Sequence, residues 1–172
     1  FFWLVYTNFI REVRLTLYFK SKEAVILKKE LATQVNAYLA NIGVSYIKLH
    51  NLHWNVVGSQ FKAAHEYLET LYDALADVLD AIAELLKMNG EAPLASMKGY
   101  LSVATIPELE SVELDVKSAM QTVLKDMESL RTQASFIREQ ADKENQFDVV
   151  AHMEDDVANY NKTIWFIQSM LK

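Results

Sequence analysis

The chain has 172 residues, 51% of them hydrophobic and 23% charged, so it is long enough for one well-packed globular domain and short of two. Only four Gly and two Pro favour a mostly helical fold, and the lack of Cys excludes disulfides and thiolate metal sites. The net charge of −6 is uneven: residues 1–29 hold six Lys or Arg and two acids (+4), and residues 30–172 hold eleven and twenty-one (−10). The basic start suits an anionic partner, and the acidic remainder suits cations.

The chain begins with a run of ten mostly apolar residues, FFWLVYTNFI, followed by Arg11, Glu12 and Arg14. This run is too short to span a bilayer, and a secretory signal would carry its positive charge before the apolar run. We therefore expect residues 1–23 to be a basic N-terminal appendage, to which the pattern assigns no structure. Residues 24–172 are expected to form the working domain.

Two long amphipathic helices are predicted next. The first runs from about residue 23 to Gly58, with apolar residues and His53 recurring at spacings of three and four. The residues on this stripe are Leu31, Val35, Leu39, Ile42, Tyr46, Leu49, His53 and Val56. Ser59 is a plausible cap for the second helix, expected over residues 60–88.

A long connection separates these helices from two more. Asn89, Gly90 and Pro93 break the pattern, and residues 94–105 are expected to form a short helix within the connection. A third helix, carrying a stripe from Val112 to Ile137, is expected after Pro107, and a fourth after the polar segment ADKENQ. The predicted fold is all-α, a four-helix bundle whose long connection between helices two and three matches ferritin-like topology.

One face of the second helix carries two pairs of potential metal ligands. His65 and Glu69 are four residues apart, as are Asp80 and Glu84, so each pair occupies successive turns. His65 and Glu84 are roughly 28 Å apart along such a helix, too far to share one ion. The pairs are placed symmetrically about Leu75. Two copies crossing antiparallel there would therefore form two equivalent sites of imidazole and carboxylate ligands, suited to iron or a similar divalent metal.

An alternative reading is a solvated acidic face on an ordinary bundle helix, which spacing alone favours. Like charges four residues apart, as at Asp80 and Glu84, repel by a few tenths of a kcal/mol. His53, twelve residues before His65 and at the end of the preceding helix, shifts the balance towards a metal site.

Residues 24–172 resemble the Dps family, the miniature ferritins named as DNA-binding proteins from starved cells. The resemblance is strongest over LHWNVVGSQFKAAHEYLETLYDALADVLDAIAELL, followed by NGEAPLASMKGYL and, near the end, TIWF. It implies an iron-binding ferroxidase centre at a two-fold interface, with His53, His65 and Glu69 from one subunit and Asp80 and Glu84 from its partner. Glu69 stands where many members have Asp. The Glu-x-x-His motif of ordinary ferritins precedes none of the histidines.

The resemblance also implies a function. Iron would be oxidised from Fe(II), usually by hydrogen peroxide, and stored as ferric mineral in a hollow cytoplasmic shell, a dodecamer, with no organic cofactor and no membrane association. Trp54 would donate or relay an electron, or else pack the interface. His50 would be a hydrogen-bonded helix histidine or a weak ligand, and Trp165 is expected in the core.

The alternative function is DNA compaction by a basic N-terminal arm that contacts phosphates without reading sequence. The arm would use Arg11, Arg14, Lys20, Lys22, Lys28 and Lys29. The competing reading is a plain solvated segment, because acidic and aromatic residues interrupt the basic ones. Iron oxidation and DNA compaction do not exclude each other.

Overall fold

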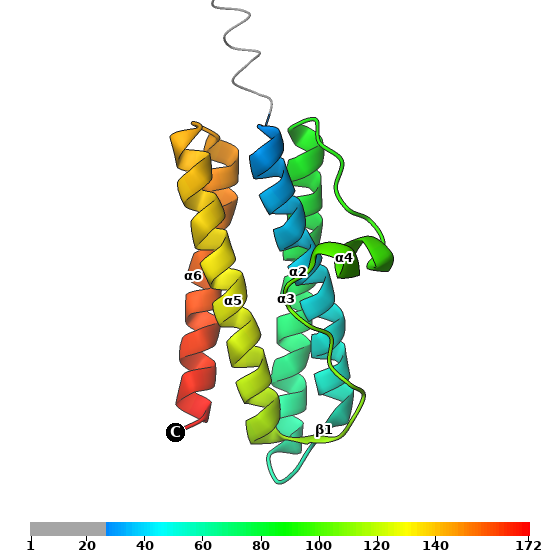
Figure 1. Ribbon diagram of the computed structural model, residues 1–172. Coiled ribbons are helices and arrows are strands. Elements are labelled where there is room, and N and C mark those ends of the chain that lie inside the picture. Colours follow the sequence, from blue (N-terminus) through cyan, green and yellow to red (C-terminus); the bar gives the residue numbers. More distant parts are fainter. Residues whose placement is uncertain (1–26) are drawn as a thin grey trace, which may run out of the picture.

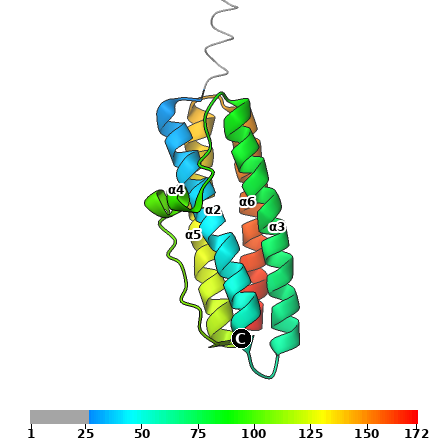
Figure 2. The same ribbon diagram turned by 90° about the vertical axis from the view of Figure 1, so that its right-hand side faces the viewer.

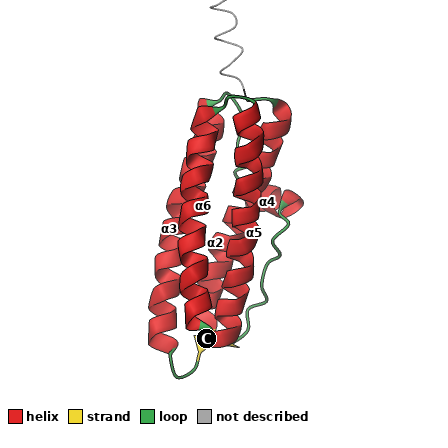
Figure 3. Cartoon of the chain, turned by 90° about the vertical axis from the view of Figure 1, so that its left-hand side faces the viewer, coloured by secondary structure: helices red, strands yellow, loops and turns green. Residues whose placement is uncertain are grey.

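The computed structural model describes residues 27–172, so the expectations for residues 1–23 and for the basic residues from Arg11 to Lys22 lie outside it. The elements within the described range are α2 (Lys29–Asn55), β1 (Val56–Val57), α3 (Phe61–Met88), α4 (Met97–Val103), β2 (Leu114–Asp115), α5 (Val116–Lys143) and α6 (Phe147–Met170). The four long helices stand side by side in one bundle (Figure 3). The predicted all-α, ferritin-like four-helix bundle is confirmed.

The helices form two antiparallel pairs joined by one long crossover. α2 packs along α3, and α5 packs along α6. The connection that carries α4 runs from the end of α3 at one end of the bundle to the start of α5 at the other (Figure 1). It passes over the side formed by α2 and α5, with α3 and α6 on the opposite side (Figure 2). Among the described residues, the connection therefore leaves α3 uncovered.

The core is formed by the apolar stripes of the four long helices. In α3 the buried side chains include Leu68, Leu75, Ile82 and Leu85, which recur at helical spacing on one face. Burial of each such side chain contributes roughly 1.5–3 kcal/mol to the hydrophobic stabilisation. None of the helices in the described part of the chain is long and apolar enough to cross a membrane.

Three predictions at the helix ends are wrong. α2 ends at Asn55, because Val56 pairs with Leu114 in a parallel ladder and leaves the helix while staying buried. α5 begins at Val116, since the Asp115 side chain accepts from the Ser118 backbone N–H at 3.0 Å; Val112 is exposed outside the helix. Ser59 does not cap α3, which starts at Phe61 without a side-chain cap.

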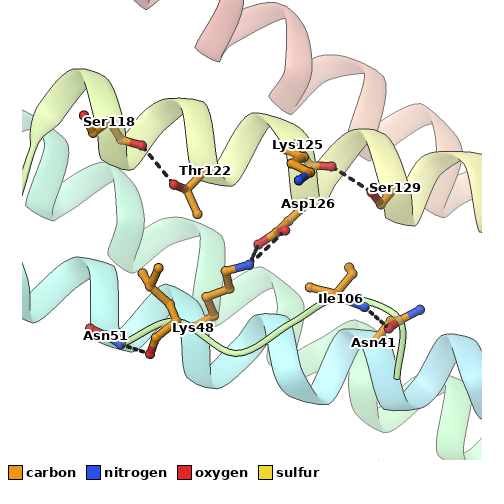
Figure 4. Close-up of polar contacts among 10 residues, drawn as sticks. Asn41, Lys48, Asn51, Ile106, Ser118, Thr122, Lys125, Asp126 and Ser129 are labelled. Atoms are coloured by element: carbon orange, nitrogen blue, oxygen red, sulfur yellow. Dashed lines mark hydrogen bonds and ion pairs between the residues drawn. The ribbon is translucent and has the colours of Figure 1, made fainter. Parts of the chain in front are cut away.

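Asn41 fastens the crossover to the bundle. This buried side chain accepts through Oδ1 from the backbone N–H of Thr105 at 2.8 Å. The same oxygen accepts from the backbone N–H of Ile106 at 2.9 Å (Figure 4). Its Nδ2 donates to Gln133 Oε1 at 2.8 Å and to Thr105 Oγ1 at 3.1 Å. Both donors and both acceptor positions of the amide are thus used, which satisfies buried backbone groups of the connection.

The short helix α4 rests on α2 at a position that requires glycine. A Cβ added at Gly43 would come within 2.5 Å of the Tyr100 ring, so only the missing side chain lets the ring lie against the helix backbone. This close approach and the Asn41 hydrogen bonds together hold the crossover in place.

Candidate metal centre

The two histidines on either side of the α2–α3 turn meet in the structure. His53 lies in the last turn of α2 and His65 near the start of α3, and their rings stack with centroids 3.6 Å apart and planes inclined by 22°. His53 is buried and His65 is half-buried. Gly58, at φ +122°, lies in the turn that brings them together, in a conformation that favours glycine.

Each ring is held by the backbone of the other histidine. His53 Nδ1 lies 2.9 Å from the His65 carbonyl oxygen, and His65 Nδ1 lies 2.8 Å from the His53 carbonyl oxygen. A carbonyl oxygen can only accept, so Nδ1 donates in both rings, and the neutral imidazoles keep their lone pairs on Nε2. A hydrogen bond of this kind orients an imidazole and raises its basicity as a metal ligand. The pair is therefore suited to bind metal through Nε2.

His65, Glu69, Asp80 and Glu84 are named the ligand stripe of α3, and its three carboxylates are all exposed. Glu69 lies one turn after His65, whereas Asp80 and Glu84 lie towards the other end of the helix. The helix rises by roughly 17 Å between Glu69 and Asp80, so these two groups cannot share one ion. Within residues 27–172, no three His, Asp or Glu side chains come close enough to hold a metal ion. One chain thus offers two separate, incomplete sets of ligands.

His50 fits the reading of a hydrogen-bonded helix histidine. Its Nδ1 lies 2.9 Å from the Tyr46 carbonyl oxygen one turn earlier, and its ring stacks on Tyr72 at 3.9 Å between centroids. Tyr72 also contacts the His53 ring edge-on. Partial burial, and then the negative charges of Glu69 and Asp73, raise the pKa of Tyr72. The sequence interpretation missed Tyr72, although its spacing from Glu69 places both on one face of α3.

The two tryptophans considered from the sequence are both exposed in the chain. Trp54 has 68% of its surface exposed and contacts the His50 ring edge-on, with centroids 5.4 Å apart. Trp165, expected in the core, is 64% exposed, and that expectation is wrong. The reason is helical register: Ile164 and Ile167 form the buried stripe of α6, and Trp165 lies off it beside Phe166.

A second polar cluster, absent from the sequence interpretation, lies inside the bundle. The Tyr38 hydroxyl on α2 donates to Asp156 Oδ2 at 2.8 Å and lies 2.7 Å from the Tyr160 hydroxyl on α6. Burial raises the pKa of the Asp156 carboxyl to about 6, although the Tyr38 hydrogen bond and the charge of His152 act in the opposite direction. Burial also raises the pKa of both tyrosines.

The raised pKa of Asp156 predicts a pH-dependent loss of stability. Between about pH 4 and pH 6 the folded state keeps a proton that the unfolded state has released, so the free energy of unfolding falls as pH rises, by at most about 3 kcal/mol. Asp156→Asn cannot ionise, and its amide oxygen can still accept from Tyr38. Thermal unfolding of both proteins from pH 4 to pH 8 should show the variant gaining stability relative to the wild type through this window. A constant difference would contradict the prediction.

The chain matches known proteins over nearly all of its described length. A family model for the ferritin-like domain matches residues 32–172. Antigen TpF1 of Treponema pallidum is 36% identical over 143 residues, covering 83% of this chain and 80% of that protein. Its crystal structure superposes with a TM-score of 0.83 at 33% identity, covering 87% of this chain and 94% of that one. The fold and these matches define a ferritin-like protein.

Further relatives specify the family within that class. The DNA protection during starvation protein of Brevibacillus brevis is 31% identical over 147 residues, covering 85% of this chain and 97% of that protein. The Dps structure from Vibrio cholerae, described as a member of a broad superfamily of ferritin-like diiron-carboxylate proteins, has a TM-score of 0.81 at 30% identity and covers 84% of this chain and 90% of that one. The chain belongs to the Dps family.

Proposed function

We propose that this chain is an iron-storing ferroxidase whose reaction centre forms between two copies. The copies pair about a two-fold axis, with their α3 helices antiparallel near Ala74 and Leu75. His53, His65 and Glu69 of one copy then face Asp80 and Glu84 of the partner subunit. The observation that carries the proposal is the stacked His53–His65 pair, whose Nδ1 atoms are both committed to backbone carbonyls.

Three further observations support an interfacial rather than an internal centre. The carboxylates on α3 are exposed, so they are accessible to a second copy. The crossover lies over α2 and α5 and leaves α3 uncovered in the described part of the chain. The bundle core between α2 and α5 holds an ion pair, Lys48 with Asp126, and no set of ligands for two irons among residues 27–172.

Iron is the substrate in this proposal. Two Fe(II) ions each lose one electron to a single hydrogen peroxide molecule, whose O–O bond breaks. With two water molecules consumed, the products are two FeOOH units of mineral and four protons. The oxygen and nitrogen ligands suit both oxidation states of iron, and supplying both electrons from paired irons avoids release of hydroxyl radical. The chain's part is to hold the ions together and to orient the imidazoles.

The test is Fe(II) oxidation by the purified full chain, measured with peroxide and with oxygen alongside the particle mass. We expect a closed shell, a dodecamer, that oxidises Fe(II) faster with peroxide than with oxygen and retains the ferric product. A stable monomer with the same iron affinity and rate would contradict the interfacial centre.

DNA binding is the second candidate function, and the names of the relatives favour it: several are called DNA protection during starvation proteins. In this chain six of the seventeen Lys and Arg residues lie within residues 1–29, and a basic segment binds phosphates in a salt-dependent way without reading sequence. Two of these basic residues, Lys28 and Lys29, lie in the described range, and Lys28 pairs with Glu144 at 3.2 Å.

Truncation tests this second function. Residues 1–26 should be removed rather than residues 1–29, because Leu27 is buried in the core. We expect the truncated protein to lose its retardation of DNA at low salt, since four of the six basic residues are gone, and to oxidise Fe(II) at the wild-type rate. Unchanged DNA retardation would show that residues 1–26 are not needed for DNA binding. A lower oxidation rate would show that residues 1–26 contribute to the shell.

A further inference from the structure

Tyr72 lies against the histidine pair without being a ligand of the proposed centre. Its ring meets the His53 ring edge-on, with centroids 5.3 Å apart and planes at 88°. The His53 ring also stacks on the His65 ring. The His53 imidazole is therefore contacted by two rings of α3, one nearly perpendicular to it and one nearly parallel to it.

Tyr72 is itself fixed by residues of α2. The His50 ring stacks on it at 3.9 Å with planes inclined by 24°, and Tyr46 contacts it edge-on at 6.4 Å. His50 cannot turn freely, because its Nδ1 donates to the Tyr46 carbonyl oxygen at 2.9 Å. A series of contacts thus connects the Tyr46 carbonyl of α2 to the His50 ring, the His50 ring to Tyr72 of α3, and Tyr72 to the His53 ring of α2.

Tyr72 also lies beside the carboxylate ligand of the same chain. It follows Glu69 by three residues on α3, so the two side chains are neighbours on the helix surface. One aromatic ring therefore borders both an imidazole ligand and a carboxylate ligand of the proposed centre.

We propose that Tyr72, stacked on His50, is a positioning residue of the metal centre: its ring fixes the orientation of His53 Nε2 before metal binds. The inference rests on the proposed function, since it concerns the ligands of that same centre. Orientation of a ligand by its neighbours is known to set metal affinity, and loss of such a neighbour typically weakens binding about 10–100-fold. The ring of Tyr72 makes the contact with His53, so a phenylalanine at this position should keep the positioning role.

The experiment uses Co(II), whose absorption spectrum reports ligand geometry without iron turnover. Co(II) is titrated into the assembled full-length protein, and affinity and spectrum are compared among variants. Tyr72→Leu should bind Co(II) at least about tenfold more weakly than the wild type and show an altered spectrum. Tyr72→Phe should restore both properties. Tyr67→Leu is the matched control, because Tyr67 is another half-buried tyrosine of α3 and lines the groove between α3 and α6. This variant should bind Co(II) with the wild-type affinity.

Two further variants make every result decisive. If Tyr72→Leu does not assemble, His50→Leu removes the stacking partner from α2, leaves Tyr72 in place and should also weaken Co(II) binding. Wild-type affinity and spectrum in both Tyr72→Leu and His50→Leu would overturn the positioning role. His65→Ala distinguishes this from failure of the proposed function: if it binds Co(II) as the wild type does, the centre itself is wrong. If His65→Ala abolishes binding and Tyr72→Leu does not alter it, only the positioning role fails.

Discussion

Replacing His65 or Glu84 by alanine should lower the rate of peroxide-driven Fe(II) oxidation at least about 100-fold, because each substitution removes a ligand from every centre of a symmetric shell. The double substitution should cost far less than the product of the two single effects, since ligands of one centre act as a unit. Glu84 is exposed, so its loss should barely change stability. Stopped-flow oxidation at fixed protein mass measures these effects.

A control is available one residue away on the same helix. Glu66 is an exposed carboxylate of α3 beside His65, paired with Lys62 at 3.5 Å on the surface and outside the ligand stripe. Glu66→Ala should therefore keep the wild-type oxidation rate. If it lowers the rate as much as Glu84→Ala does, the effect comes from the overall negative charge of α3 and not from defined ligands.

Lys48→Met should be among the most destabilising single substitutions in the bundle. Lys48 on α2 reaches both carboxylate oxygens of Asp126 on α5, at 2.8 and 3.1 Å, and the two side chains are 6% and 9% exposed (Figure 4). Removing one partner leaves a buried carboxylate without its countercharge, which costs about 3–5 kcal/mol. Chemical denaturation of the assembled protein measures the change in the free energy of unfolding.

The pH dependence and a double variant separate charge from packing. Burial already raises the pKa of Asp126, and loss of Lys48 should raise it further, so Lys48→Met should be least destabilised at low pH and lose stability as pH rises. Lys48→Met combined with Asp126→Leu removes both charges and should recover most of the loss. If the double variant is as unstable as the single one, or the loss does not change with pH, packing rather than the unpaired charge is responsible.

The sequence predicted the helices well because their apolar stripes are long and regular, and it predicted their ends poorly. Val56 and Val112 continue a helical spacing, yet a ladder with Leu114 removes the first from α2 and the Asp115 cap places the second before α5. The ladder depends on Val56 and Leu114, 58 positions apart, meeting in space, which no local pattern contains. The cap is local, since Asp115 accepts from Ser118 three residues later, and the apolar spacing carries no information about it. The prediction for Trp165 is wrong for a different reason: Trp165 lies off the buried stripe of α6, which Ile164 and Ile167 form.

For the candidate centre too, local spacing predicted some features and tertiary structure determined the others. Spacing alone predicted that His65, Glu69, Asp80 and Glu84 share one face of a helix, and the structure places them on α3 in that order. The stacking of His53 on His65 and their reciprocal hydrogen bonds depend on the conformation of the α2–α3 turn, which the spacing did not specify. Whether these residues bind iron together remains a prediction, because the proposed centre requires a second chain.

Complementation between two inactive variants tests the interfacial centre most directly. A pair of one His65→Ala subunit and one Glu84→Ala subunit contains one centre that lacks both ligands and one centre that lacks neither. Random reassembly of equal amounts should therefore restore about a quarter of the wild-type oxidation rate, with subunit exchange verified by native mass spectrometry. Complete exchange without any recovery of activity would show that the ligands do not come from two chains.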